Sequence, residues 1–245
     1  LIKLRHPLSL DPEGMLLASI LAKKVAVSST HVLIDIPVGP KTKIKTIGHA
    51  ISLERKFQKI AKKLKLKLKV IITDGRQPIG SGIGPNLEAR DVLYILRREV
   101  SAPKDLENKS IFMAIKILEM AKVKDAKEKV IECLQSGKAY KKFKDIIKAQ
   151  QGNPNIRPSD IKIGKHTYNY KASKSGKIKQ IDTSIISKIA RIAGAPIDKE
   201  AGIYLYKHIN DQVKKGEHLF TIYSKSQKKL TYAKKVLEQG PVIIT

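Results

Sequence analysis

The sequence predicts an α/β fold: a mixed α/β domain with helices around a sheet, followed by a small α+β domain at the C-terminal end. Two observations indicate this. Before Gly152, short apolar runs of strand length alternate with longer segments whose apolar residues recur at helical spacing. After Gly152 comes a turn-rich break, and beyond it apolar residues recur with a period of two. We therefore expect two domains, over residues 1–152 and 153–245.

The first domain is expected to contain a strand–helix–strand crossover. The run from His31 to Val38 is apolar except for Asp35 and leads into a loop at Gly39, which is typical of a buried parallel strand. Apolar residues then recur at helical spacing over 47–64, and a second strand-like run covers 68–73. Helical spacing also predicts four further helices, over 89–98, 104–121, 124–135 and 139–150.

The second domain is expected to be a small α+β unit that follows the break at 152–158. Its apolar patterns predict strands over 166–170, 177–181, 203–206 and 219–223, and helices over 182–193 and 227–237.

The segment after Asp11 predicts a helix with two polar groups on one face. Asp11 is a suitable N-cap, and Pro12 suits the first helical position. The next residues are apolar on nearly every side, which favours a buried helix. Ser19 and Lys23 are four residues apart and so lie side by side. Either they form a binding pair, or the serine bonds back to the helix carbonyls and the lysine extends to the surface.

Several segments resemble the signatures of one enzyme family. Ser19, Ile20, Lys23 and Lys24, after an acidic helix start, match the base-binding helix of the thymidine and pyrimidine nucleoside phosphorylases. The family's Pro-Leu-Gly and Gly-Asn-x-Leu-Glu signatures resemble 73–80 and 84–88. One branch of the family, the archaeal AMP phosphorylases, has segments similar to those at 194–196, 198–199, 201–203 and 219–223. In this family the phosphate-binding loop and most of a helical domain precede the point where this chain starts. The resemblance thus implies that the phosphate-site half is missing and that the first helix belongs to the helical domain.

The reaction implied by the resemblance is phosphorolysis of AMP, which gives adenine and ribose 1,5-bisphosphate. Asp11 would then be the catalytic proton donor, and Ser19, Lys43 and Lys23 would bind the nucleotide. Inorganic phosphate would be the co-substrate and no other cofactor would be needed. The resemblance also implies a homo-oligomer as full-length protein and an inactive chain without the missing part. From the residues alone, Asp11 is equally a helix cap, and Lys43, beside Lys41 and Lys45, is equally a solvated loop lysine.

Alternatives remain open for the function. Lys23 matches the base contact of the pyrimidine enzymes, so a thymidine phosphorylase is a second possibility. The formal charge of +27 suggests a third, a stand-alone lysine-rich module that binds anions or nucleic acid. Against dedicated nucleic-acid binding, only 8 of the 49 basic residues are Arg, and no zinc finger, recognition helix or RNP-like motif is present.

The remaining composition predicts an ordinary cytoplasmic protein. No apolar run reaches membrane-spanning length and no signal peptide pattern opens the sequence, so we expect no membrane partner. The single cysteine, Cys133, lies in a helical pattern and is expected to fill the core. The six histidines lack metal-ligand spacing, so no metal site is expected.

Overall fold

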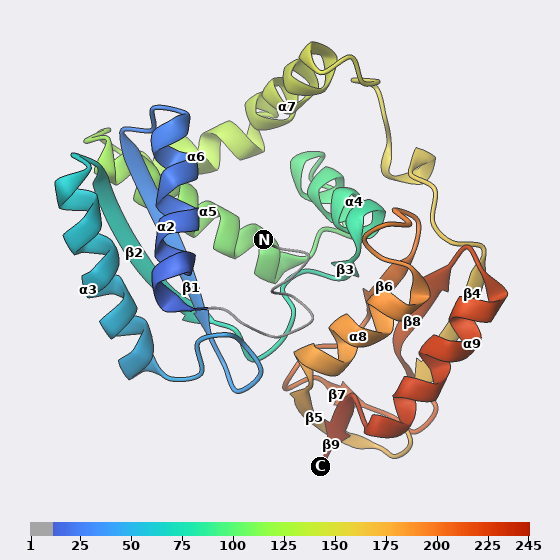
Figure 1. Ribbon diagram of the computed structural model, residues 1–245. Coiled ribbons are helices and arrows are strands. Elements are labelled where there is room, and N and C mark those ends of the chain that lie inside the picture. Colours follow the sequence, from blue (N-terminus) through green and yellow to red (C-terminus); the bar gives the residue numbers. More distant parts are fainter. Residues whose placement is uncertain (1–11) are drawn as a thin grey trace.

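The computed structural model describes residues 12–245 and has two units joined by a long connection (Figure 1). The elements before residue 152 are α2 Glu13–Ala26, β1 His31–Val38, α3 Ile47–Lys63, β2 Lys67–Asp74, β3 Gly82–Ile83, α4 Pro85–Leu96, α5 Lys104–Met120, α6 Ala126–Gln135 and α7 Lys138–Ala149. The later elements are η1 Pro158–Asp160, β4 His166–Lys171, β5 Gly176–Ile181, α8 Thr183–Ala193, β6 Gly202–Leu205, β7 Gln212–Val213, β8 His218–Ser224, α9 Gln227–Lys235, η2 Val236–Gln239 and β9 Val242–Ile244.

The N-terminal unit is built on two parallel strands. β1 and β2 pair from His31 and Lys67 to Val38 and Asp74, with α3 as the crossover between them, which confirms the predicted strand–helix–strand unit. Alternate β1 side chains point to one face of the sheet, where they join residues of α2 and α3 in one apolar core that includes Phe57. Helix α5 packs on β1, and its Lys109 reaches strand residue Asp35.

Helix α2 is less buried than its sequence predicts. Only Leu17 and Leu21 are buried, while Met15 and Val25 are exposed. An apolar pattern shows that a helix surface is suited to packing, but it does not show that a neighbour is present, and within residues 12–245 a single stripe of α2 meets the core. The helix begins at Glu13, one residue later than expected, with Pro12 in the cap position and no side-chain cap.

The C-terminal unit combines two small sheets with two packed helices. One sheet has the order β3-β6-β8-β4 and the other β7-β5-β9. Helices α8 and α9 pack against each other and on β8. The helix α8 begins after Asp182 because this side chain accepts hydrogen bonds from the backbone N–H groups of Ser184 and Ile185. The core includes Ile189, Ile203 and Phe220, all fully buried, and the result is the expected small α+β arrangement.

The segment 77–86 ties the N-terminal unit to the C-terminal sheet. Strand β3 pairs antiparallel with β6, and the Leu205 N–H donates to the Ser81 carbonyl at 2.8 Å. The Ile209 N–H donates to the Gln77 side chain at 2.6 Å. The predicted division at residue 152 stays a prediction, but a strand from before that point completes the second sheet.

Two further features concern exposure. Cys133 lies on α6 as predicted, but it is exposed, so the expectation that it fills the core is wrong. Apolar spacing places a residue on a helix face without fixing how deep that face lies.

Within residues 12–245 no helix combines the length and the apolar character that crossing a membrane requires.

Candidate active site

Two loops meet at the carboxyl ends of β1 and β2: the first begins at Gly39 and the second at Gly75. In open α/β sheets ligands bind in the crevice outside this edge. The Gly75 N–H donates to the Val38 carbonyl at 2.9 Å, which holds the second loop against the end of β1. A Cβ atom on Gly39 would lie 2.6 Å from the carbonyl carbon and oxygen of Gly75. The two loops therefore approach this closely only because glycine stands at this point of the first loop.

The first loop presents Lys43, one of the predicted substrate-binding residues. The Thr42 hydroxyl lies 2.9 Å from the Gly39 carbonyl oxygen and 2.6 Å from that of Ile44, so it fixes the loop between them. Lys43 is exposed and borders a cavity of about 220 Å³ between β1, the loop and α2. A lysine held on an ordered loop at a strand end is suited to an anionic group such as a phosphate.

Helix α2 forms another wall of this cavity. Leu16 and Ile20 line it, together with Lys43. Ser19 and Lys23 are exposed on α2 and do not line the cavity. Ser19 directly precedes the lining residue Ile20, and Lys23 lies about one turn after it. Asp11, the predicted proton donor, lies outside the described residues. The structure thus brings α2 and the Lys43 loop to one cavity but leaves the roles of Ser19 and Lys23 as predictions.

A polar cluster that the sequence did not predict lies on the opposite face of the sheet. The Lys109 ammonium of α5 lies 2.6 Å from the Asp35 carboxylate of β1. The Thr73 hydroxyl of β2 donates to Asp35 at 2.7 Å and accepts from Lys109 at 3.1 Å. The Asp35 carboxylate therefore has both a cation and a hydrogen-bond donor as partners, as a partly buried charge requires. The signal in the sequence was the single acid in the apolar run 31–38.

An ion pair links the Lys43 loop to the C-terminal unit. The Lys41 ammonium lies 3.2 Å from the Asp182 carboxylate at the start of α8. Burial opposes the charge on Asp182, but hydrogen bonds from Ser184 and Ile185 and the Lys41 cation outweigh it and lower its pKa. This pair is a side-chain contact between the loop and the C-terminal unit, and the lysine half of it is largely exposed.

The turn before β3 is held by a buried acid. Asp91 on α4 accepts the Ser81 N–H at 2.8 Å and the Gly82 N–H at 2.7 Å. Burial is the main cause of its raised pKa, and the two N–H groups act in the opposite direction. Asp91 thereby fixes the strand that joins the C-terminal sheet.

The chain thus combines an α/β unit, with a lysine-bearing loop at the carboxyl edge of its parallel strands, and a small α+β domain. This edge is where open α/β sheets bind their ligands. Residues 177–243 match the pyrimidine nucleoside phosphorylase C-terminal domain. The chain is 41% identical over 245 residues to an AMP phosphorylase of Thermofilum pendens, covering 100% of this chain and 47% of that protein. It is 46% identical over 235 residues to an AMP phosphorylase of Thermococcus kodakarensis, covering 95% and 46%. It is 42% identical over 247 residues to a "Putative thymidine phosphorylase" of Legionella pneumophila, covering 100% and 47%.

These comparisons confirm the resemblance seen in the sequence. Nearly the whole chain is similar to one half of proteins of the thymidine and pyrimidine nucleoside phosphorylase family, with AMP phosphorylases among its relatives at 41–46% identity. It spans about half the length of the curated relatives it matches.

Proposed function

We propose that this chain is part of a nucleotide phosphorylase that cleaves the N-glycosidic bond of AMP with inorganic phosphate. The main support is the similarity of 95–100% of the chain to proteins named AMP phosphorylase. The second support is the cavity between α2 and the loop of Lys43 at the carboxyl edge of the sheet. No cofactor other than the co-substrate phosphate is needed for this reaction.

The proposed reaction is a displacement at the ribose. A phosphate oxygen forms a bond to C1′ while the bond from C1′ to the base breaks and its electron pair moves onto adenine. A proton delivered to N7 stabilises the departing base, and Asp11 is the proposed donor. Lys43 would bind the 5′-phosphate and Ser19 the nucleotide. The products are adenine and ribose 1,5-bisphosphate.

We further propose that the isolated chain does not turn over AMP. Holding phosphate close to C1′ is a main source of rate acceleration in such a displacement, and the family's phosphate-binding loop has no counterpart in this sequence. The test compares the isolated chain with a hybrid chain, defined as the Thermococcus kodakarensis relative in which this sequence replaces the matching region. With AMP and phosphate, adenine release is expected from the hybrid chain and not from the isolated chain. Turnover by the isolated chain at an ordinary enzymatic rate would contradict the proposal.

A second candidate activity is phosphorolysis of thymidine. Lys23 matches the base contact of the pyrimidine enzymes, and a Legionella pneumophila relative carries the name "Putative thymidine phosphorylase". The same hybrid chain separates the two candidates when kcat/KM is measured for AMP and thymidine. If thymidine is the substrate, its kcat/KM exceeds that for AMP and falls strongly in the Lys23→Ala variant. If AMP is the substrate, its kcat/KM is the larger of the two.

A further inference from the structure

One sheet of the C-terminal unit has a covered face and an open face. Helices α8 and α9 pack on one face of the sheet β3-β6-β8-β4, where Ile203 and Phe220 are fully buried (Figure 1). Side chains alternate between the two faces of a strand, so Tyr204 of β6 and Tyr206 just after it point to the other face. Tyr206 is 43% exposed there, and Asn169 of β4 on the same face is exposed as well. Part of this second face is therefore open to solvent.

Aromatic side chains gather on the open face. The rings of Tyr204 and Tyr206 lie edge to face with their centroids 5.2 Å apart, and the His218 ring lies 6.3 Å from that of Tyr206. Tyr223 of β8 pairs in register with Gly202, two residues before Tyr204, so its side chain lies on the same face. We call these four side chains the aromatic platform: Tyr204, Tyr206, His218 and Tyr223.

Cations border the aromatic platform. Burial raises the pKa of Tyr204, and that of Tyr223 to about 12, while the Arg90 cation of α4 acts on both in the opposite direction. Arg90 therefore lies near both hydroxyls, and these stay uncharged at neutral pH. On the strand β4, Lys171 is exposed and pairs in register with His218. The whole chain carries a formal charge of +27, which attracts polyanions to its surface.

A polar hollow continues from the platform toward the N-terminal unit. It has a volume of about 380 Å³ and is lined by Tyr206, His208 and the loop that precedes α5. Its lining carboxylates, those of Asp105 and Asp211, each accept a backbone N–H group. Carboxylates repel a phosphate but accept hydrogen bonds from the amino groups of bases. A ligand that reaches into this hollow would therefore place a base there and not a phosphate.

This combination of rings, cations and a polar hollow fits unpaired nucleotides. Bases of a single strand stack on aromatic side chains exposed on a sheet, and nearby cations neutralise the phosphates. We propose that the aromatic platform binds single-stranded nucleic acid with little preference for sequence, as a function separate from the phosphorolysis proposed above. Sequence motifs do not show this site because its rings come from separate strands, and the low share of Arg argues only against recognition of base edges.

Two probes of equal charge test the role of the bases. The isolated chain is added to a fluorescein-labelled oligouridine of about 12 nucleotides, or to an abasic oligomer of the same length, at about 150 mM salt, and anisotropy is followed. We expect the abasic oligomer to bind at least about tenfold more weakly, because it keeps the phosphates but cannot stack. Equal affinities would overturn the proposal, since the lysine-rich surface alone would then account for the binding. So would displacement of the oligouridine by free uridine monophosphate at a concentration near the oligomer's own Kd, since the site would then bind single nucleotides.

Two exposed tyrosines of the C-terminal unit provide a matched pair of variants. Tyr206 of the platform is 43% exposed, and Tyr232 on α9, which packs on the covered face, is 50% exposed. Tyr206→Ala is expected to weaken oligouridine binding by about fivefold or more, as the loss of one stacked base does, and Tyr232→Ala by less than about twofold. Tyr206→Phe removes the hydroxyl that lies 3.0 Å from that of Thr221 but keeps the ring, so it should bind like the parent chain. Equal losses in the two alanine variants, or an equal loss in Tyr206→Phe and Tyr206→Ala, would contradict stacking on the platform.

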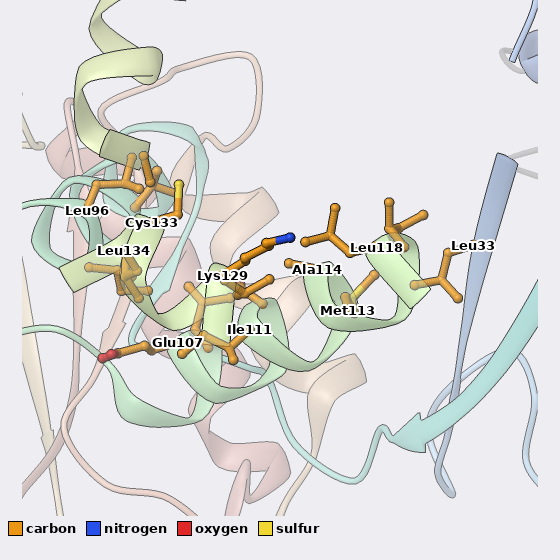
Figure 2. Close-up of a pocket in the computed structure, with 17 residues that line it drawn as sticks. Leu33, Leu96, Glu107, Ile111, Met113, Ala114, Leu118, Lys129, Cys133 and Leu134 are labelled. Carbon is orange, nitrogen blue, oxygen red and sulfur yellow. The ribbon is translucent and has the colours of Figure 1, made fainter. Parts of the chain in front are cut away.

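A pair of lysines tests the electrostatic part of the binding. Lys171 borders the platform, whereas Lys129 is an exposed lysine of α6 that lines an apolar groove of the N-terminal unit (Figure 2). Lys171→Ala should reduce the slope of log K against log[salt] by about 0.7, the value for one phosphate of a single strand, and Lys129→Ala should leave the slope unchanged. Equal slopes for the two variants would place the nucleic acid elsewhere on the lysine-rich surface and overturn the proposal. The same contrasts are expected in the hybrid chain, whether or not it is catalytically active, and their loss there would also overturn the proposal.

Discussion

The glycine at the end of β1 provides a sharp test of the structure. In Gly39→Ala the new methyl carbon would lie 2.6 Å from the Gly75 carbonyl carbon and oxygen and 2.9 Å from the Arg76 nitrogen. All three are backbone atoms, so a side-chain rotation cannot relieve the contact. The backbone there is also held in place, because the Gly75 N–H donates a hydrogen bond to the Val38 carbonyl. Overpacking of this kind costs about 1–3 kcal/mol, and we expect the upper part of that range. For a chain of this size the corresponding fall in Tm is roughly 4–12 °C.

The control for this prediction has the opposite sign. Gly48 lies in helix α3, and a methyl group there would have nothing within 4 Å. Gly48→Ala should therefore raise stability by about 0.5–1 kcal/mol, because alanine loses less conformational freedom in a helix. Both variants and the parent chain are compared by thermal and urea unfolding, followed by circular dichroism. The reasoning fails if Gly39→Ala unfolds with the parent chain, or if the two substitutions shift stability in the same direction.

Three further predictions concern charged residues. Asp182→Asn keeps the helix cap but removes a carboxylate whose pKa is lowered by folding; such a carboxylate stabilises above its unfolded pKa and loses this effect as pH falls through the folded value. In urea unfolding the variant should be less stable by about 1 kcal/mol at pH 7, and this deficit should shrink as the pH is lowered below the ordinary pKa of aspartate. A deficit that stays constant as the pH is lowered would refute this. Lys109→Met leaves Asp35 without its cation and should cost about 1–2 kcal/mol, whereas Lys116→Met, which removes a more exposed pair from the same helix, should cost under about 0.5 kcal/mol. In the hybrid chain Lys43→Ala should raise KM for AMP by about tenfold or more and change kinetics with adenosine little; equal effects on both substrates would exclude a contact with the 5′-phosphate.

Most of the fold was predictable because its patterns are local. The predicted strand 31–38 matches β1, because it is a long apolar run. The expected helix 104–121 differs from α5 by one residue, because its apolar residues keep helical spacing over its whole length. The two-residue strand β3 was not predicted. It has no periodicity of its own and is defined only by pairing with β6.

The candidate site was predictable in part. The loop of Lys43 could be predicted because it comes after an apolar strand and begins at a glycine. The structure places this loop beside α2, as expected if both contribute to one binding site. The contact between Asp35 and Lys109 joins a strand to a helix far along the chain, and sequence spacing holds no information on such a pair. Burial of α2 and of Cys133 was misjudged for a related reason, because apolar residues show what a surface is suited to contact and not whether the contact is made.

The role of Asp11 as proton donor is the central claim of the proposed mechanism. The decisive measurement is steady-state phosphorolysis of AMP by the hybrid chain and its Asp11→Asn variant, together with AMP affinity and Tm of both. Asparagine keeps the size of the residue and can cap a helix, but it cannot deliver a proton. The mechanism predicts that kcat falls by about 10² or more while AMP affinity and Tm stay the same. Near-normal turnover with a lowered Tm would contradict it and would identify Asp11 as a residue that serves stability and not catalysis.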